Sequence, residues 1–156
     1  MILALDCATK TGWALIDKGK VVESGVQDFS KKRGESNGGM FLRFRKWLYS
    51  TVISDGITND PFINLLVYEQ AHHRGGAATE VCVNLTGRVQ EIAAQSGIEV
   101  ATYHTASLKK WATGKGKGDK GAMIAEAEKR TGKIMQDDNE ADAILLGLMA
   151  WEEYGI

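Results

Sequence analysis

Little in this chain points to a secreted, disulfide-bonded or membrane-spanning protein. The only cysteines are Cys7 and Cys82, and no CxxC or Cys/His spacing suggests a zinc site. No apolar run approaches the roughly 20 residues that a spanning helix needs. The N-terminus also lacks the basic-then-apolar pattern of a secretory leader. We therefore expect a cytosolic protein with no membrane partner and two small, buried thiols.

An excess of charge of one sign is also missing. The formal net charge is −1, with 44% hydrophobic and 25% charged residues, a balance typical of a folded domain. A length of 156 residues suits one domain spanning 1–156. The net charge gives no general reason to expect nucleic acid, although a local basic patch can be offset by acids gathered in a metal site.

Apolar patterning predicts five strands and five helices, with a single proline at Pro61. The strands are expected at residues 1–6, 12–17, 21–29, 63–68 and 98–103. The helices are expected at residues 40–48, 77–96, 105–112 (from a Thr105 cap), 120–130 and 138–153. The first three strands follow one another directly, whereas helices precede the last two. This order predicts an α/β, ribonuclease H-like fold, with a five-stranded mixed sheet (three antiparallel, then two parallel strands) and helices on both faces.

Acidic residues stand at the ends of three predicted elements. Asp6 closes the first strand, Glu69 closes the fourth, and Asp142 lies in the first turns of the last helix. If strands one and four are parallel neighbours, their carboxyl ends meet at the edge where α/β sheets bind ligands. Carboxylates gathered there would bind a hard cation such as Mg²⁺. For each strand acid alone, the alternative is an ordinary first solvated residue.

The start of the last helix holds further acids. Asp142 shares its helical face with apolar residues at i+3, i+4 and i+7, so its burial is costly unless it is paired or metal-bound. Asp138 lies four residues earlier and could point the same way, which makes it a candidate fourth ligand. The alternative is an acid that only stabilises the helix start. Asp137 and Glu140 have capping-box spacing, which favours a structural role for both.

Basic residues are concentrated in one glycine-rich segment. These candidates for phosphate binding are Lys109, Lys110, Lys115, Lys117 and Lys120. The alternative is a solvated flexible loop.

A second polar loop follows Glu69 and contains His72, His73 and Arg74 beside two glycines. These three residues could face DNA, or they could be ordinary exposed loop residues.

Four segments together resemble the RuvC family of Holliday junction resolvases, most closely its shorter, phage-type members. They are LALDCATKTGWALI (3–16), LLVYEQ (65–70), LKKWATGKGKGDK (108–120) and DDNEADAILLGL (137–148). The resemblance implies that Asp6, Glu69 and Asp142 bind metal. The family's fourth ligand, an Asp or His, falls on Asn139, so the sequence departs from the family there and Asp138 is the expected substitute.

The resemblance also implies a function. It predicts a Mg²⁺-dependent (or Mn²⁺-dependent) endonuclease with two ions per site that resolves Holliday junctions by paired cuts, in DNA recombination and repair. Lys109 and Lys120 have the spacing of two family lysines that act at the scissile region. The loop at 72–74 corresponds to one that enters the branch point. A homodimer in the cytoplasm of a bacterium or a phage-infected host is implied as well.

Three other interpretations stay open. A broader nuclease of the same fold would cut flaps, other branched DNA or RNA–DNA hybrids with the same metals. A catalytically inactive junction-binding protein is compatible with Asn139, although all three principal acids are present. An actin-like kinase or ATPase is disfavoured, because the turn after Asp6 lacks the glycine of the Asp-x-Gly-Thr phosphate loop and the chain is too short for a duplicated domain.

Overall fold

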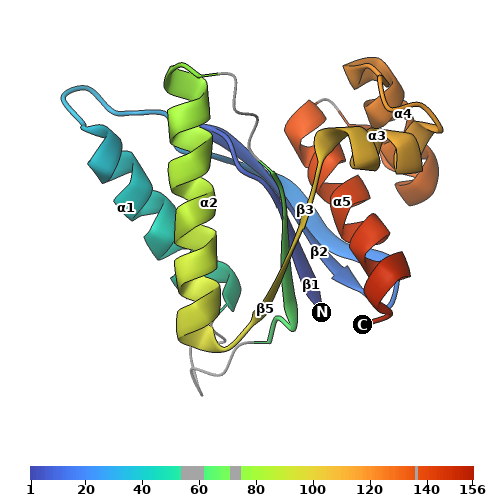
Figure 1. Cartoon of the computed structure of the whole chain (residues 1–156), viewed down its shortest axis with the longest axis horizontal. Helices are drawn as coiled ribbons and strands as arrows, with labels where there is room; N and C mark the ends of the chain where they lie inside the picture. Colours follow the sequence, from blue (N-terminus) through green and yellow to red (C-terminus); the bar gives the residue numbers. More distant parts are fainter. Residues whose placement is uncertain (54–61, 71–74, 136) are drawn as a thin grey trace.

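A five-stranded mixed sheet divides the molecule into two apolar cores (Figure 1). The computed structural model describes residues 1–53, 62–70, 75–135 and 137–156. The strands are β1 (Ile2–Asp6), β2 (Lys10–Asp17), β3 (Lys20–Asp28), β4 (Leu65–Glu69) and β5 (Glu99–Tyr103). Their order is β3-β2-β1-β4-β5, with antiparallel pairing among the first three and parallel pairing of β4 to both β1 and β5. The predicted sheet is therefore confirmed.

The central strand β1 is buried on both faces, which explains its unbroken apolar sequence. Ile2 and Ala4 point into one core, and Leu3 and Leu5 point into the other. All four side chains are fully buried. Asp6 is the first residue of the strand to reach the surface, where it is half-buried.

Helices cover both faces of the sheet, as the sequence predicts. The helices are α1 (Asn37–Trp47), a π-helix η1 (Leu48–Ile53), α2 (Ala77–Ser96), α3 (Thr105–Thr113), α4 (Lys120–Thr131) and α5 (Asp138–Tyr154). Helices α1 and α2 lie on one side of the sheet and α3, α4 and α5 on the other (Figure 1). Among the ranges described, no helix combines the length and the apolar character needed to cross a membrane.

Several element boundaries differ from the sequence prediction. Helix α1 begins at Asn37 rather than residue 40, because the Ser36 hydroxyl accepts a hydrogen bond from the Gly39 amide and caps the helix. The π-helix η1 was not predicted. Thr105 is not the cap of α3: His104 takes that position, and the Thr105 hydroxyl instead donates a hydrogen bond to the Glu69 carboxylate.

Candidate metal and nucleic-acid site

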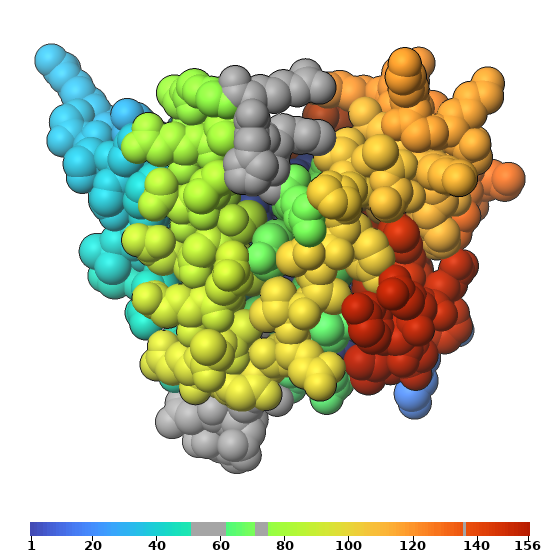
Figure 2. Space-filling view, in the orientation of Figure 1, coloured from blue at the N-terminus to red at the C-terminus, as the bar shows by residue number. Residues whose placement is uncertain are grey.

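Asp6 and Glu69 end two adjacent parallel strands at the same edge of the sheet. The β1–β4 register pairs Leu5 with Tyr68, so the two acids follow at the same level. In the space-filling view, α2 stands on one side of this region and α3 and α4 stand on the other, with part of β4 visible between them (Figure 2). Parallel pairing of β1 and β4 therefore places two carboxylates side by side at the carboxyl edge of the sheet.

The first turn of α5 comes to the same edge because Gly12 has no side chain. Gly12 pairs with Asp6 across the β1–β2 ladder. A Cβ atom on Gly12 would lie 1.9 Å from the carbonyl oxygen of Asn139. The Asp137 carboxylate caps the helix by accepting a hydrogen bond from the Asn139 amide at 2.8 Å. The start of α5 thus lies close enough for the charges of Asp138 and Asp142 to act on Asp6.

The acids form one electrostatic group. Burial raises the pKa of Asp6 well above its ordinary value, and the negative charges of Glu69, Asp142 and Asp138 raise it further. The pKa of Asp142 is raised to about 7, first by burial and then by Glu69 and Asp138. The charges of the four sequence-predicted acids therefore act on one another at this edge of the sheet, and each acid raises the cost of ionising its neighbours.

Two of the four acids contact polar groups from neighbouring helices. The Glu69 carboxylate accepts a hydrogen bond from Thr105 at the start of α3. The Asp138 carboxylate lies 3.3 Å from the ammonium group of Lys120 at the start of α4. Within the described ranges, no three His, Cys, Asp or Glu side chains stand in an arrangement that would hold a metal ion. The carboxylate oxygens are of the donor type that suits a hard cation.

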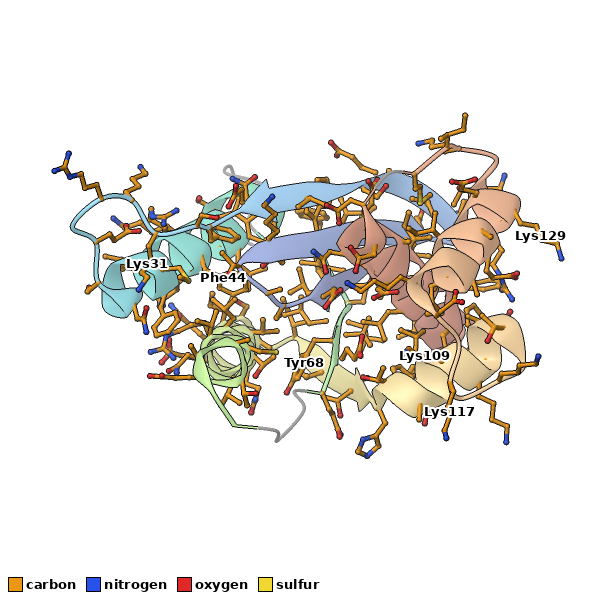
Figure 3. All side chains as sticks on the ribbon, turned by 90° about the horizontal axis from the view of Figure 1, so that it is seen from above. Lys31, Phe44, Tyr68, Lys109, Lys117 and Lys129 are labelled. Carbon is orange, nitrogen blue, oxygen red and sulfur yellow. The ribbon has the colours of Figure 1, made fainter. Side chains whose placement is uncertain are left out.

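Two lysines from the basic segment lie beside the acids. Lys109 on α3 is half-buried and Lys120 on α4 is exposed, and both positive charges lower the pKa of Asp142. Lys110, Lys115 and Lys117 are exposed on the same segment. Seen from above the edge, Lys109 and Lys117 lie on the same side of Tyr68, the residue before Glu69 (Figure 3). The basic segment therefore flanks the acid group on the side of α3 and α4.

The remaining predicted residues have different outcomes. His72, His73 and Arg74 lie outside the described residues. Glu140 does not share the capping role of Asp137, because its carboxylate accepts a hydrogen bond from the Ser24 hydroxyl of β3 at 2.8 Å.

Two residues at the site were missed in the sequence. Gly12 permits the close approach of α5, and the Thr105 hydroxyl orients Glu69. Thr105 could have been found from the topology. The strand before it, β5, pairs with β4 so that Tyr103 lies opposite Glu69, and Thr105 follows two residues later. Nothing local in the sequence indicates the contact that Gly12 makes.

Comparison with known proteins gives the fold of this chain. No protein-family model matches the chain, and no curated protein matches it in sequence. Among solved structures, the Thermus thermophilus RuvC structure superposes with a TM-score of 0.74 at 16% identity, covering 99% of this chain and 96% of that one. T. thermophilus RuvC in complex with Holliday junction substrate gives a TM-score of 0.73 at 15% identity, covering 94% and 90%. The chain therefore has a RuvC-like fold, as the sequence predicted.

Proposed function

We propose that this chain is a metal-dependent DNA endonuclease that cuts four-way junctions in DNA recombination and repair. The observation that carries the proposal is the convergence of Asp6, Glu69, Asp138 and Asp142 at one sheet edge, with Lys109 and Lys120 beside them. Neither the acids nor the lysines alone would favour phosphodiester chemistry. Their combination supports it, because phosphate and its metal ions need negative and positive groups side by side.

The acids fit a divalent cation by donor type and by charge. Asp6, Glu69, Asp138 and Asp142 supply only carboxylate oxygens, which are ligands that Mg²⁺ or Mn²⁺ accepts. Burial is the main cause of the raised pKa values of Asp6 and Asp142, and the charges of the neighbouring acids add to it; bound cations would offset both effects. When bound, one or two such ions would activate the attacking water and stabilise the leaving oxygen of an in-line displacement.

The protein side chains have separate roles in this proposal. The acids hold and orient the cations, and Thr105 keeps the Glu69 carboxylate in place through its hydrogen bond. Lys109 and Lys120 offset the charge that develops on the scissile phosphate. Lys110, Lys115 and Lys117 hold the backbone of the same DNA strand on the α3–α4 side of the edge. The expected products carry 5′-phosphate and 3′-hydroxyl ends.

The proposed substrate also bears on assembly. A four-way junction has two-fold symmetry, so paired cuts need two active sites, and we propose that the chain acts as a homodimer. The proposal places it in the cytoplasm of a bacterium or a phage-infected host. Sedimentation of the chain alone and with a junction would measure the number of chains in each complex.

A cleavage assay tests the proposed activity. Labelled four-way junctions are incubated with the full chain and Mg²⁺ or Mn²⁺, beside linear duplex, flap and RNA–DNA substrates. We expect paired nicks in the junction, and we expect Asp6→Asn, Asp142→Asn and Glu69→Gln to abolish them while junction binding persists. Glu23→Gln, on the exposed part of β3, is the matched control and should cut normally. Cleavage of flaps or hybrids in preference to junctions would show that the four-way junction is not the substrate. Junction binding without any nicking would show that the chain is not a nuclease.

A further inference from the structure

A second basic surface lies at the same edge of the sheet, on the other side of the acids from α3 and α4. It surrounds a cavity of about 380 Å³ between the turn after β1, the segment after β3 and the first turns of α1 and α2. Its lining combines four polar residues, Thr9, Ser30, Lys31 and Asn37, with four apolar ones, Met40, Ala77, Ala78 and Val81. Thr9 is three residues from Asp6, so the cavity and the acid group share the carboxyl end of β1. Seen from above, Lys31 and Lys109 lie on opposite sides of Tyr68 (Figure 3).

Lys31, which lines the cavity, is the first of three consecutive basic residues. Lys31, Lys32 and Arg33 are all exposed and form the basic segment 31–33. Within the ranges that the structure describes, none of their side chains is in an ion pair. The acids nearby are already engaged: Glu35 pairs with Arg43 at 2.6 Å, and Asp28 accepts hydrogen bonds from the amide and hydroxyl of Ser30. The segment therefore carries three positive charges that no ion pair within the described ranges holds, although Lys32 acts electrostatically on Glu35.

The basic segment 31–33 is held in place by α1. Arg43 donates hydrogen bonds to the carbonyl oxygens of Phe29 and Ser30, at 3.0 and 3.1 Å. Glu35, held by the same guanidinium, also accepts a hydrogen bond from the Lys32 amide. This network fixes the backbone on both sides of Lys31, so the charges are presented at a defined position rather than on a free tail.

The lining of the cavity suits a sugar-phosphate backbone. Thr9, Ser30 and Asn37 offer hydroxyl and amide groups, and Lys31 offers a charge for a phosphate oxygen. Ala77 and Ala78 are small, so they leave space for a strand to approach the first turn of α2. Among the described residues, no aromatic or acidic side chain lines this cavity, which argues against an aromatic or cationic ligand.

We propose that the cavity and the basic segment 31–33 bind the phosphate backbone of a second DNA arm. The lysines of α3 and α4 would hold one arm and the 31–33 side another, so that the branch lies over the acid group. This assignment rests on the proposed function, because it takes the substrate to be branched DNA. A second arm bound there would add phosphate contacts to those made at the lysines of the α3–α4 side.

Junction binding without cleavage tests this site. The full chain is titrated with a labelled four-way junction in EDTA at several salt concentrations. In the variant K31Q/K32Q/R33Q we expect at least a tenfold weaker Kd for the junction, and a slope of log K against log salt that is less steep by about 2 to 3. The matched control K20Q/K46Q/K133Q removes three exposed lysines elsewhere and should change both quantities much less. Equal changes in the two triple variants would overturn the proposal.

Hydroxyl-radical footprinting locates the contact. Wild-type protein should protect phosphates on two arms, and K31Q/K32Q/R33Q should lose protection on one of them. K115Q/K117Q should lose protection on the other. If the 31–33 variant leaves both footprints intact, the second arm binds elsewhere and the proposal is wrong.

Failure of this inference can be told from failure of the proposed function. Wild-type protein that cuts junctions in Mg²⁺, with a 31–33 variant that binds and cuts equally well, would remove only the second-arm site. Wild-type protein that binds both arms but never cuts would remove only the nuclease activity. Wild-type protein that does not bind branched DNA would remove both.

Discussion

Gly12 and Asn139 are in direct backbone contact, and this contact sets the distance between β2 and the first turn of α5. A Cβ atom on Gly12 would lie 1.9 Å from the Asn139 carbonyl oxygen and 2.2 Å from its carbonyl carbon. Gly12 also pairs with Asp6 in the sheet. One glycine thus determines how close the acids of α5 come to the acid of β1.

Gly12→Ala is expected to destabilise the protein and to weaken metal binding. The added methyl group would meet backbone rather than a flexible side chain, so α5 must move. Overpacking of this kind costs about 1–3 kcal/mol or more. Urea unfolding measures the loss, and a Mg²⁺ titration of cleavage measures the displacement of the acids.

Gly87→Ala is the matched control for this change. Gly87 lies within α2, and the position that an alanine methyl group would take there is open space. Replacing a helical glycine by alanine there should stabilise the helix by up to about 1 kcal/mol. If Gly12→Ala left stability unchanged or raised it as Gly87→Ala does, the close approach of α5 would not depend on Gly12.

Thr105 is expected to act as a positioning residue for Glu69. In Thr105→Val the hydroxyl that donates to Glu69 is lost while the shape of the side chain is nearly kept. We expect a higher Mg²⁺ concentration for half-maximal cleavage, with junction affinity in EDTA unchanged. Thr105→Ser, which keeps the hydroxyl, should restore the Mg²⁺ dependence. If Thr105→Val and Thr105→Ser needed the same Mg²⁺ concentration for half-maximal cleavage, the hydrogen bond would have no role in metal binding.

The sheet and the acids were predictable from the sequence because they depend on local pattern and strand order. Apolar runs predicted strands at residues 1–6 and 63–68, and the parallel pairing expected between these two strands brings Asp6 and Glu69 together. The Gly12 contact could not be predicted, since it joins residues far apart in the chain. The strand order could have placed Thr105 near Glu69, but a threonine at a helix start also suits a cap, and the sequence does not choose between these two hydrogen bonds.

Asp138 rather than Asn139 is expected to act as the fourth acidic ligand. The charge of Asp138 raises the pKa values of both Asp6 and Asp142, so Asp138 acts on the same group of acids. The Asn139 amide donates a hydrogen bond to the Asp137 carboxylate, and the Asn139 carbonyl group lies against Gly12. Asp138→Asn should therefore raise the Mg²⁺ requirement for cleavage, whereas Asn139→Ala should not. If Asn139→Ala raised the Mg²⁺ requirement and Asp138→Asn did not, Asn139 would be the fourth ligand.

The raised pKa of Asp142 predicts a metal-free stability that falls as pH rises. The pKa is about 7 in the folded chain against an ordinary value of 3.8, so between these values the folded state binds more protons than the unfolded state. Unfolding free energy then decreases from about pH 4 to pH 7 through this group and levels off above. Cations compete with protons for the Asp142 carboxylate, so Mg²⁺ should raise the Tm more at pH 8 than at pH 5. For the same reason, cleavage should increase as the pH rises toward 7. Thermal melts of wild type and Asp142→Asn, with and without Mg²⁺, measure this. A metal-free wild type whose stability rises over this range as steeply as that of Asp142→Asn would contradict the assignment of the raised pKa to Asp142.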